Sequence, residues 1–327
     1  MIDMIDDNNN KKNFDNYQTP VKQIKPFFSL NTKQILSCLF ITEDGEIFVG
    51  TKYWLSIYYF SEKRLIAKNH ISIGSEINDI DSYNFENSRY VALATSDGFI
   101  NLLRIKYTDN ILSVDTHERL SIYNGEAKLV SILDQNTIVT VGDNSLITII
   151  TKSISSDKSW NQKQYKRKNN ITALKYYKDQ IFIGYENGEI ETFMLVKEHC
   201  NDAEMLTSKM KTTKSSYQFK SAILGFYFNP EPIVVTEQSY YELDQFLKVK
   251  DHYSFSFKAN KVSVVFDNID GKNMQRMIVS DSNQVNIYEN NKFVSAPALS
   301  SKSLISLSFL GDALIALSSQ SVSLYKI

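Results

Sequence analysis

The stretch that decides the fold is TSDGFINLLRI, residues 95–105. Its polar turn, Ser96-Asp97-Gly98, leads into a run of alternating apolar residues, a pattern that predicts a β-strand with one buried face. Weaker copies of the turn lie near positions 52, 143, 187, 238, 282 and 319. With the copy at 97, the successive spacings are 45, 46, 44, 51, 44 and 37 residues, which favours one repeat domain over two unrelated domains.

Around these turns the chain runs through seven cycles of apolar run, short turn, apolar run, polar turn and alternating run, between residues 35 and 327. Each cycle predicts a four-stranded antiparallel sheet. The last cycle ends one strand short, while an additional strand candidate at about residues 21–30 precedes the first cycle. We therefore expect this N-terminal strand to complete the last sheet, so that a ring of sheets closes without an open edge.

The repeated unit resembles the WD40 pattern, in which an acidic residue or Asn and a Gly form a turn before an alternating strand. Asp97-Gly98 and Asn187-Gly188 fit it best, although the chain has no Trp-Asp dipeptide and no Gly-His pair that opens a repeat. The resemblance implies an all-β, seven-bladed WD40-like β-propeller over residues 21–327, similar in style to the small propeller nucleoporins and other scaffold propellers. Because the buried Asp and His of that family are missing, we expect aromatic residues to pack between the blades. These are Tyr58, Phe193, Tyr288 and Tyr325.

Composition excludes several classes of protein. The chain has 36 Lys and Arg against 37 Asp and Glu, so its net charge of −1 provides no overall field that attracts nucleic acid or anionic lipid. Cys38 and Cys200 lie outside any CxxC or zinc pattern. Residues 1–20 are rich in Asp and Asn, and we expect them to form a disordered tail. They lack the apolar segment that a secretory signal contains, so we do not expect them to be one. We expect a location in the cytoplasm or nucleus.

The sequence contains no recognisable catalytic motif. The four His residues fall in polar segments, and no pattern places one beside a nucleophile. The carboxylate pair Glu43-Asp44 is typical of a solvated hairpin turn. We therefore expect no enzymatic activity, no cofactor, no metal and no dedicated small-molecule site.

Candidate binding residues are found where the repeats depart from the pattern. Lys52-Tyr53-Trp54 replaces a small polar turn with a cation and two aromatic residues, and Tyr240 and Tyr241 lie near the corresponding turn of the fifth cycle. A basic insertion at about residues 152–170 has a local charge of +5. Its candidate contacts with an acidic partner are Trp160, Lys166, Arg167 and Lys168. A second insertion, at about 197–220, is either partly helical or a long outer strand and loop.

These features favour a non-catalytic protein–protein interaction scaffold, a subunit of a larger intracellular assembly, with a nuclear-pore-like assembly as one candidate. Two alternatives stay open. One is an adaptor that reads peptides, of the checkpoint or ubiquitin-ligase receptor type. The other is a propeller that binds phosphoinositide or nucleic acid through the basic loop.

Overall fold

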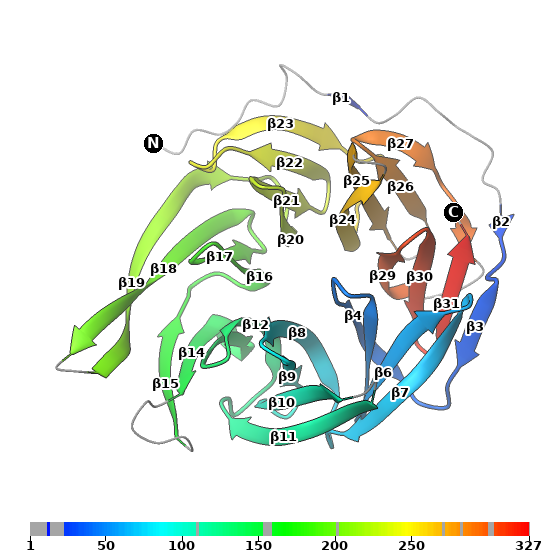
Figure 1. Cartoon of the computed structure of the whole chain (residues 1–327). Coiled ribbons are helices and arrows are strands. Elements are labelled where there is room, and N and C mark those ends of the chain that lie inside the picture. Colours follow the sequence, from blue (N-terminus) through cyan, green and yellow to red (C-terminus); the bar gives the residue numbers. More distant parts are fainter. Residues whose placement is uncertain are drawn as a thin grey trace.

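Seven sheets, each with four antiparallel strands and one extended by a short parallel strand at its edge, are arranged radially around a central axis, like the blades of a propeller (Figure 1). The computed structural model describes residues 12–13, 23–108, 111–152, 159–200, 203–269, 272–281, 284–299 and 304–326. Apart from one 3-10 turn at Asp143–Ser145, the regular elements are strands. The all-β, seven-bladed fold predicted from the repeats is therefore confirmed.

Each blade runs from an inner strand at the axis to an outer strand at the rim. Blade 1 is β4 (Leu36–Ile41), β5 (Glu46–Thr51), β6 (Trp54–Ser61) and β7 (Arg64–Ser72); blade 2 is β8 (Ile77–Phe85), β9 (Ser88–Thr95), β10 (Phe99–Thr108) and β11 (Ile111–Ser121). Blade 3 is β12 (Ala127–Asp134), β13 (Thr137–Gly142), β14 (Leu146–Lys152) and β15 (Trp160–Lys166); blade 4 is β16 (Ile171–Tyr177), β17 (Gln180–Tyr185), β18 (Glu189–Cys200) and β19 (Ala203–Gln218).

The remaining blades follow the same order. Blade 5 is β20 (Ile223–Phe228), β21 (Pro232–Thr236), β22 (Ser239–Leu243) and β23 (Val249–Ser254); blade 6 is β24 (Lys261–Ile269), β25 (Lys272–Ser280), β26 (Val285–Glu289) and β27 (Lys292–Ser295). Blade 7 is β29 (Leu304–Leu310), β30 (Ala313–Ser318), β31 (Ser321–Lys326) and β3 (Phe28–Asn31).

The ring closes through the N-terminal strand, as expected. β3 pairs antiparallel with β31, with Phe28 opposite Leu324, and the Phe27 amide donates to the Leu324 carbonyl at 2.9 Å. Just before it, β2 (Gln23–Ile24) pairs with β28 (Ala298–Leu299). Most of the tail predicted for residues 1–20 lies outside the described residues; its β1 (Lys12–Asn13) pairs with β23.

The core consists of seven apolar clusters, one between each pair of neighbouring blades. Tyr58 lies between blades 1 and 7, Phe193 between blades 3 and 4, and Tyr288 between blades 5 and 6. Tyr325 lies between blades 6 and 7, and all four rings are buried. The predicted packing of aromatic residues between blades is therefore confirmed.

A hydroxyl group at the end of the second strand shapes the turn into the third strand in several blades. Thr51 Oγ1 donates to the Trp54 carbonyl at 3.1 Å, and Thr95 Oγ1 donates to the Phe99 carbonyl at 2.8 Å. Thr236 and Ser318 make the same bond in blades 5 and 7. In these four blades the bond ties the end of the second strand to the start of the third and so stabilises a tight turn.

Both predicted insertions contain strands. Residues 160–166 form β15, so this part of the basic insertion is the outer strand of blade 3 and not a loop. The second insertion belongs to the β18–β19 hairpin, which extends beyond the disc in Figure 1. Of the two alternatives for that insertion, the partly helical one is wrong.

The closing strand allows a direct test of the ring. Deleting residues 1–31 removes β3 and should lower the free energy of unfolding by about 3 kcal/mol, since Phe28 and Leu30 would each lose about 1.5 kcal/mol of apolar burial. The exposed edge of β31 should also promote aggregation. Deleting residues 1–22 is the control, because it leaves β3 in place. Equal stability of the two variants in urea denaturation would contradict the role of β3.

Candidate interaction surfaces

The turn of blade 1 holds aromatic side chains out from a fixed backbone. Thr51 Oγ1 accepts hydrogen bonds from the amides of Tyr53 (3.2 Å) and Trp54 (2.9 Å). On the other side, the Tyr53 carbonyl accepts from the amides of Ile73 (2.8 Å) and Gly74 (3.1 Å). Hydrogen bonds therefore fix the backbone of the turn both to Thr51 and to the segment at Ile73 and Gly74.

The side chains of this turn remain accessible. Tyr53 is 48% exposed and Trp54 is 37% exposed, and the Lys52 ammonium lies 5.5 Å from the centroid of the Tyr53 ring. Ile35, 55% exposed, lies beside them, since its carbonyl accepts the Lys52 amide at 3.2 Å. We call Ile35, Lys52, Tyr53 and Trp54 the blade-1 patch. The side chains of the sequence-predicted residues 52–54 are thus all exposed.

Tyr240 and Tyr241 are buried, which corrects their assignment as exposed binding residues. They belong to β22, whose two faces are covered by blades 4 and 6, and the turn before it ends at Gln238. Gln275 Nε2 donates to the Tyr240 hydroxyl at 2.6 Å. The Tyr241 ring stacks on the His252 ring with 5.7 Å between centroids. Both tyrosines stabilise the fold.

The basic insertion does not form a single surface. Trp160 and Lys166 stand at opposite ends of β15, about 20 Å apart at about 3.3 Å per residue. Trp160 Nε1 donates to Glu118 Oε2 at 2.7 Å. Arg167 Nε donates to Glu191 Oε2 at 2.9 Å, so the charge of Arg167 is already compensated. Of the cations predicted in this insertion, Lys166 and Lys168 are exposed.

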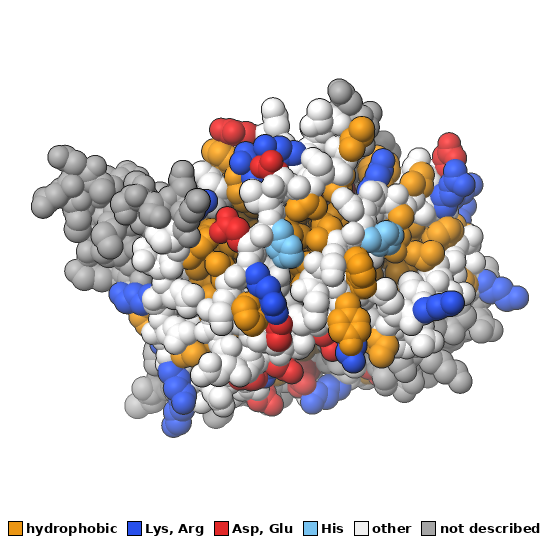
Figure 2. Space-filling model, turned by 90° about the horizontal axis from the view of Figure 1, so that it is seen from below, with side chains coloured by type: hydrophobic (Ala, Val, Ile, Leu, Met, Phe, Trp, Pro, Cys, Tyr) orange, Lys and Arg blue, Asp and Glu red, His pale blue; other side chains and the backbone are white. Residues whose placement is uncertain are grey.

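The rim of the disc carries charges of both signs. In Figure 2, blue and red side chains are interspersed around white and orange surface, with no broad area of one sign. Two histidines lie on outer strands, His70 on β7 and His117 on β11. A surface of this kind does not attract a polyanion over a long range.

One of these histidines lies beside a hydroxyl group, which the sequence did not indicate. Ser56 and His70 are opposite each other on β6 and β7, and Ser56 Oγ lies 2.9 Å from His70 Nδ1. Ser56 is only 7% exposed, and the matching positions of other blades hold buried polar residues such as Asn101 and Ser323. Asn101 Oδ1 likewise lies 3.0 Å from His117 Nε2, so the Ser56–His70 contact repeats a contact within the sheet, and the buried hydroxyl is closed to a substrate.

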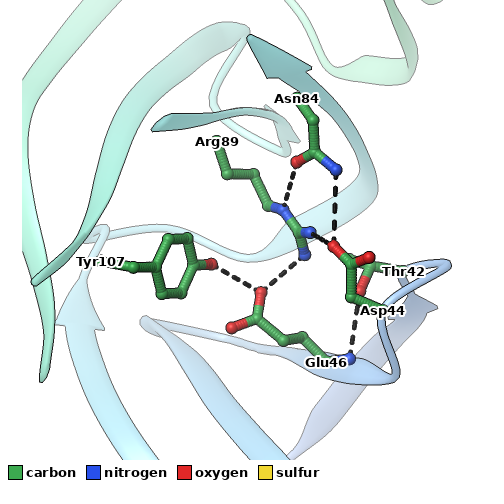
Figure 3. A network of polar contacts seen from close by, with 6 residues as sticks. All are labelled: Thr42, Asp44, Glu46, Asn84, Arg89 and Tyr107. Atoms are coloured by element: carbon green, nitrogen blue, oxygen red, sulfur yellow. Dashed lines mark hydrogen bonds and ion pairs between the residues drawn. The ribbon is translucent and has the colours of Figure 1, made fainter. Parts of the chain in front are cut away.

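A buried arginine joins blades 1 and 2, and nothing in the sequence pattern pointed to it (Figure 3). Arg89 is 3% exposed; its Nη1 donates to Glu46 Oε2 at 2.6 Å, and its Nη2 donates to Asp44. Its Nε donates to Asn84 Oδ1 at 2.8 Å. Tyr107 also donates to Glu46, at 2.6 Å, and burial together with that carboxylate raises the pKa of the Tyr107 phenol. Asp44 is therefore part of a contact between blades.

The inner strands line a central cavity of about 760 Å³ to which all seven blades contribute. Asp79 and Asp81 on β8 accept the amides of Val130 and Ile132 on β12, each at 2.9 Å, and thus link blades 2 and 3. Lys175 Nζ lies 3.5 Å from Asp81 Oδ1. Burial and the nearby Asp81 charge raise the pKa of Asp79 to about 7, although the hydrogen bond from the Val130 amide lowers it. Among the described residues, no cluster of three or more His, Cys, Asp or Glu could hold a metal ion.

Comparison with known proteins identifies the fold. Solved structures similar to this chain include the mitotic checkpoint complex (8% identity, 96% of this chain, 95% of that chain, TM-score 0.64). BBS1N in complex with ARL6DN is 11% identical, with 94% of this chain and 98% of that chain covered and a TM-score of 0.62. The computationally designed Ika8 protein is 10% identical over 94% of this chain and 100% of that chain, with a TM-score of 0.57. The chain thus has the fold of a seven-bladed β-propeller.

Identities this low establish the propeller fold alone. No family model matches the sequence. No curated protein matches it either. In the described part of the propeller, no helix has the length and apolar character needed to cross a membrane.

The Arg89 contact gives the first prediction from these surfaces. Substituting Arg89 by Ala leaves Asp44 and Glu46 side by side without their cation, and should lower the free energy of unfolding by about 3–5 kcal/mol. Arg64→Ala is the control, because Arg64 is exposed and its ion pair with Glu62 should be worth less than about 1 kcal/mol. Similar losses for both variants in urea denaturation would show that Arg89 is not a structural link.

Asp79 predicts a specific pH dependence of stability. Because its pKa in the folded protein, about 7, is above the ordinary value of 3.8, its contribution to stability is complete below about pH 4 and is lost as the pH rises through 7. Asp79→Asn keeps an oxygen acceptor for the Val130 amide and has no charge to bury. Between pH 5 and pH 8 the wild type should lose more unfolding free energy than the variant, by an amount on the order of 1–4 kcal/mol. Equal pH profiles would contradict this.

Proposed function

We propose that this propeller is a non-catalytic scaffold that binds other protein chains through the blade-1 patch. The observation that carries the proposal is the exposure of Tyr53 and Trp54 on a turn whose backbone is hydrogen-bonded on both sides. Aromatic residues are enriched in interface hot spots. A side chain on a backbone that is already fixed also loses little conformational entropy when a partner binds.

The separation of the blade-1 patch from the core supports this role. The aromatic rings that hold the blades together are buried elsewhere, at positions such as Tyr58 and Tyr288. The exposed rings of Tyr53 and Trp54 therefore have little part in holding the ring of blades closed. Exposed apolar surface that the fold does not need is typical of a binding site.

Two of the similar structures are complexes, the mitotic checkpoint complex and BBS1N with ARL6DN. By analogy, we propose a multiprotein assembly of the cytoplasm or nucleus as the setting of this propeller, with a nuclear-pore-like assembly as one candidate. A peptide-reading adaptor would use the same patch. Binding of phosphoinositide or nucleic acid through the basic insertion has less support, because Trp160 and Arg167 already bind acidic residues of the propeller.

Substitution of the patch tests the proposal. A variant with Tyr53→Ala and Trp54→Ala should lose most partners that the wild type retains in affinity purification followed by mass spectrometry. For an identified partner, affinity should fall by about 30-fold or more, the effect of removing a hot spot worth about 2 kcal/mol. Ile111→Ala is the control, because Ile111 is a 68% exposed apolar residue on β11 at the rim. Unchanged partners in a double variant with wild-type thermal stability would refute the assignment.

A further inference from the structure

A second apolar depression lies at the seam between blades 7 and 1, on the face opposite the blade-1 patch. Its volume is about 430 Å³, and its apolar lining includes Phe27, Tyr59, Phe60 and Leu310. The turns that border it, at Gly45 and Gly311, join the first and second strands of their blades. The turn at residues 52–53 joins a second strand to a third. It therefore lies on the opposite face of the propeller from the turns at Gly45 and Gly311. We call this depression the seam groove.

The seam groove is open to a ligand. Phe27 is 43% exposed and Tyr59 is 44% exposed. Gly45 and Gly311 adopt positive φ angles of 78° and 55°, and no atom lies within 4 Å of the position that a Cβ would take at either glycine. A partner backbone can therefore approach closely at both turns. The volume is sufficient for one or two large side chains.

Charged groups of both signs border this apolar surface, and its two lysines are exposed. Lys63 and Lys326 line the groove and are exposed, and the Lys68 ammonium lies 5.9 Å from the centroid of the Tyr59 ring. Of the nearby carboxylates, Asp44 is bound to Arg89 and Glu62 is paired with Arg64. Asp312 is exposed at the groove. Two exposed ammonium groups, those of Lys63 and Lys326, thus line a site in which one of the two lining carboxylates, Asp44, is already compensated.

We propose that the seam groove binds a linear peptide segment of a partner protein, with one bulky apolar side chain between acidic residues. The apolar side chain covers Phe27 and Tyr59, and the flanking carboxylates pair with Lys63 and Lys326. A ligand with negative charge alone would leave the apolar surface uncovered. Because the groove is formed by two blades, the peptide also bridges the seam at which the ring closes.

Peptide selection on the full-length protein provides the test. Random peptides of about 12 residues displayed on phage should yield sequences with an aromatic or large aliphatic residue next to Asp or Glu. Binding of a synthetic selected peptide, followed by fluorescence polarisation, should weaken about tenfold or more with Tyr59→Ala and with Lys326→Glu. It should also weaken as salt is raised.

Two controls separate this site from others. Lys178→Glu changes an exposed cation in the turn that joins the first and second strands of blade 4. Trp54→Ala changes the blade-1 patch on the other face. Neither substitution should affect peptide binding. A loss with Trp54→Ala alone would overturn the seam site and support the blade-1 patch. Failure to select peptides, or selection of peptides without acidic residues, would overturn the proposal. Self-association that Tyr59→Ala abolishes would assign the groove to a second copy of the chain and overturn it as well.

Discussion

The structure depends on apolar packing between neighbouring sheets. Each blade has apolar side chains on both faces, so no blade can bury its own apolar surface and each needs a neighbour on either side. This requirement makes closure of the ring necessary. The cluster between blades 7 and 1 brings together residues from the two ends of the chain, including Leu36 and Leu324, and β3 covers it from the rim. The core therefore fixes the blades, while the turns on both faces remain free to vary.

The repeat predicted the fold because it records a local constraint that each blade must satisfy. A polar turn such as Asp97-Gly98 and the alternation of the strand that follows it are visible within about ten residues of sequence. The surfaces were harder to predict. Tyr240 and Tyr241 lie only two and three residues from the turn at Gln238, yet this small difference in strand boundary decides whether a side chain faces solvent or core. The polar alternation of β15 likewise resembled a loop, because an outer strand is open to solvent.

Charged contacts between blades were hidden from the sequence for a different reason. Arg89 binds Asp44 and Glu46, which are 45 and 43 residues away, about one repeat earlier. Asp79 and Asp81 bind backbone amides about one repeat later. Only the ring brings such residues together, and a single sequence shows no pairing between them. These bonds link blades 1, 2 and 3 in a chain that lacks the Trp-Asp and Gly-His signatures of WD40 repeats.

The two proposed docking sites share one strand. Trp54 begins β6 on one face of the propeller, and Tyr59 lies five residues further along, about 17 Å away at about 3.3 Å per residue, beside the groove on the other face. β6 is paired on both sides, with β5 and β7, and its central residues Leu55 and Ile57 are fully buried. A strand held in this way does not bend when a partner binds at one end. Two partners docked at these sites would therefore be held at a constant separation on either side of the disc, which is the mechanical property that a scaffold requires.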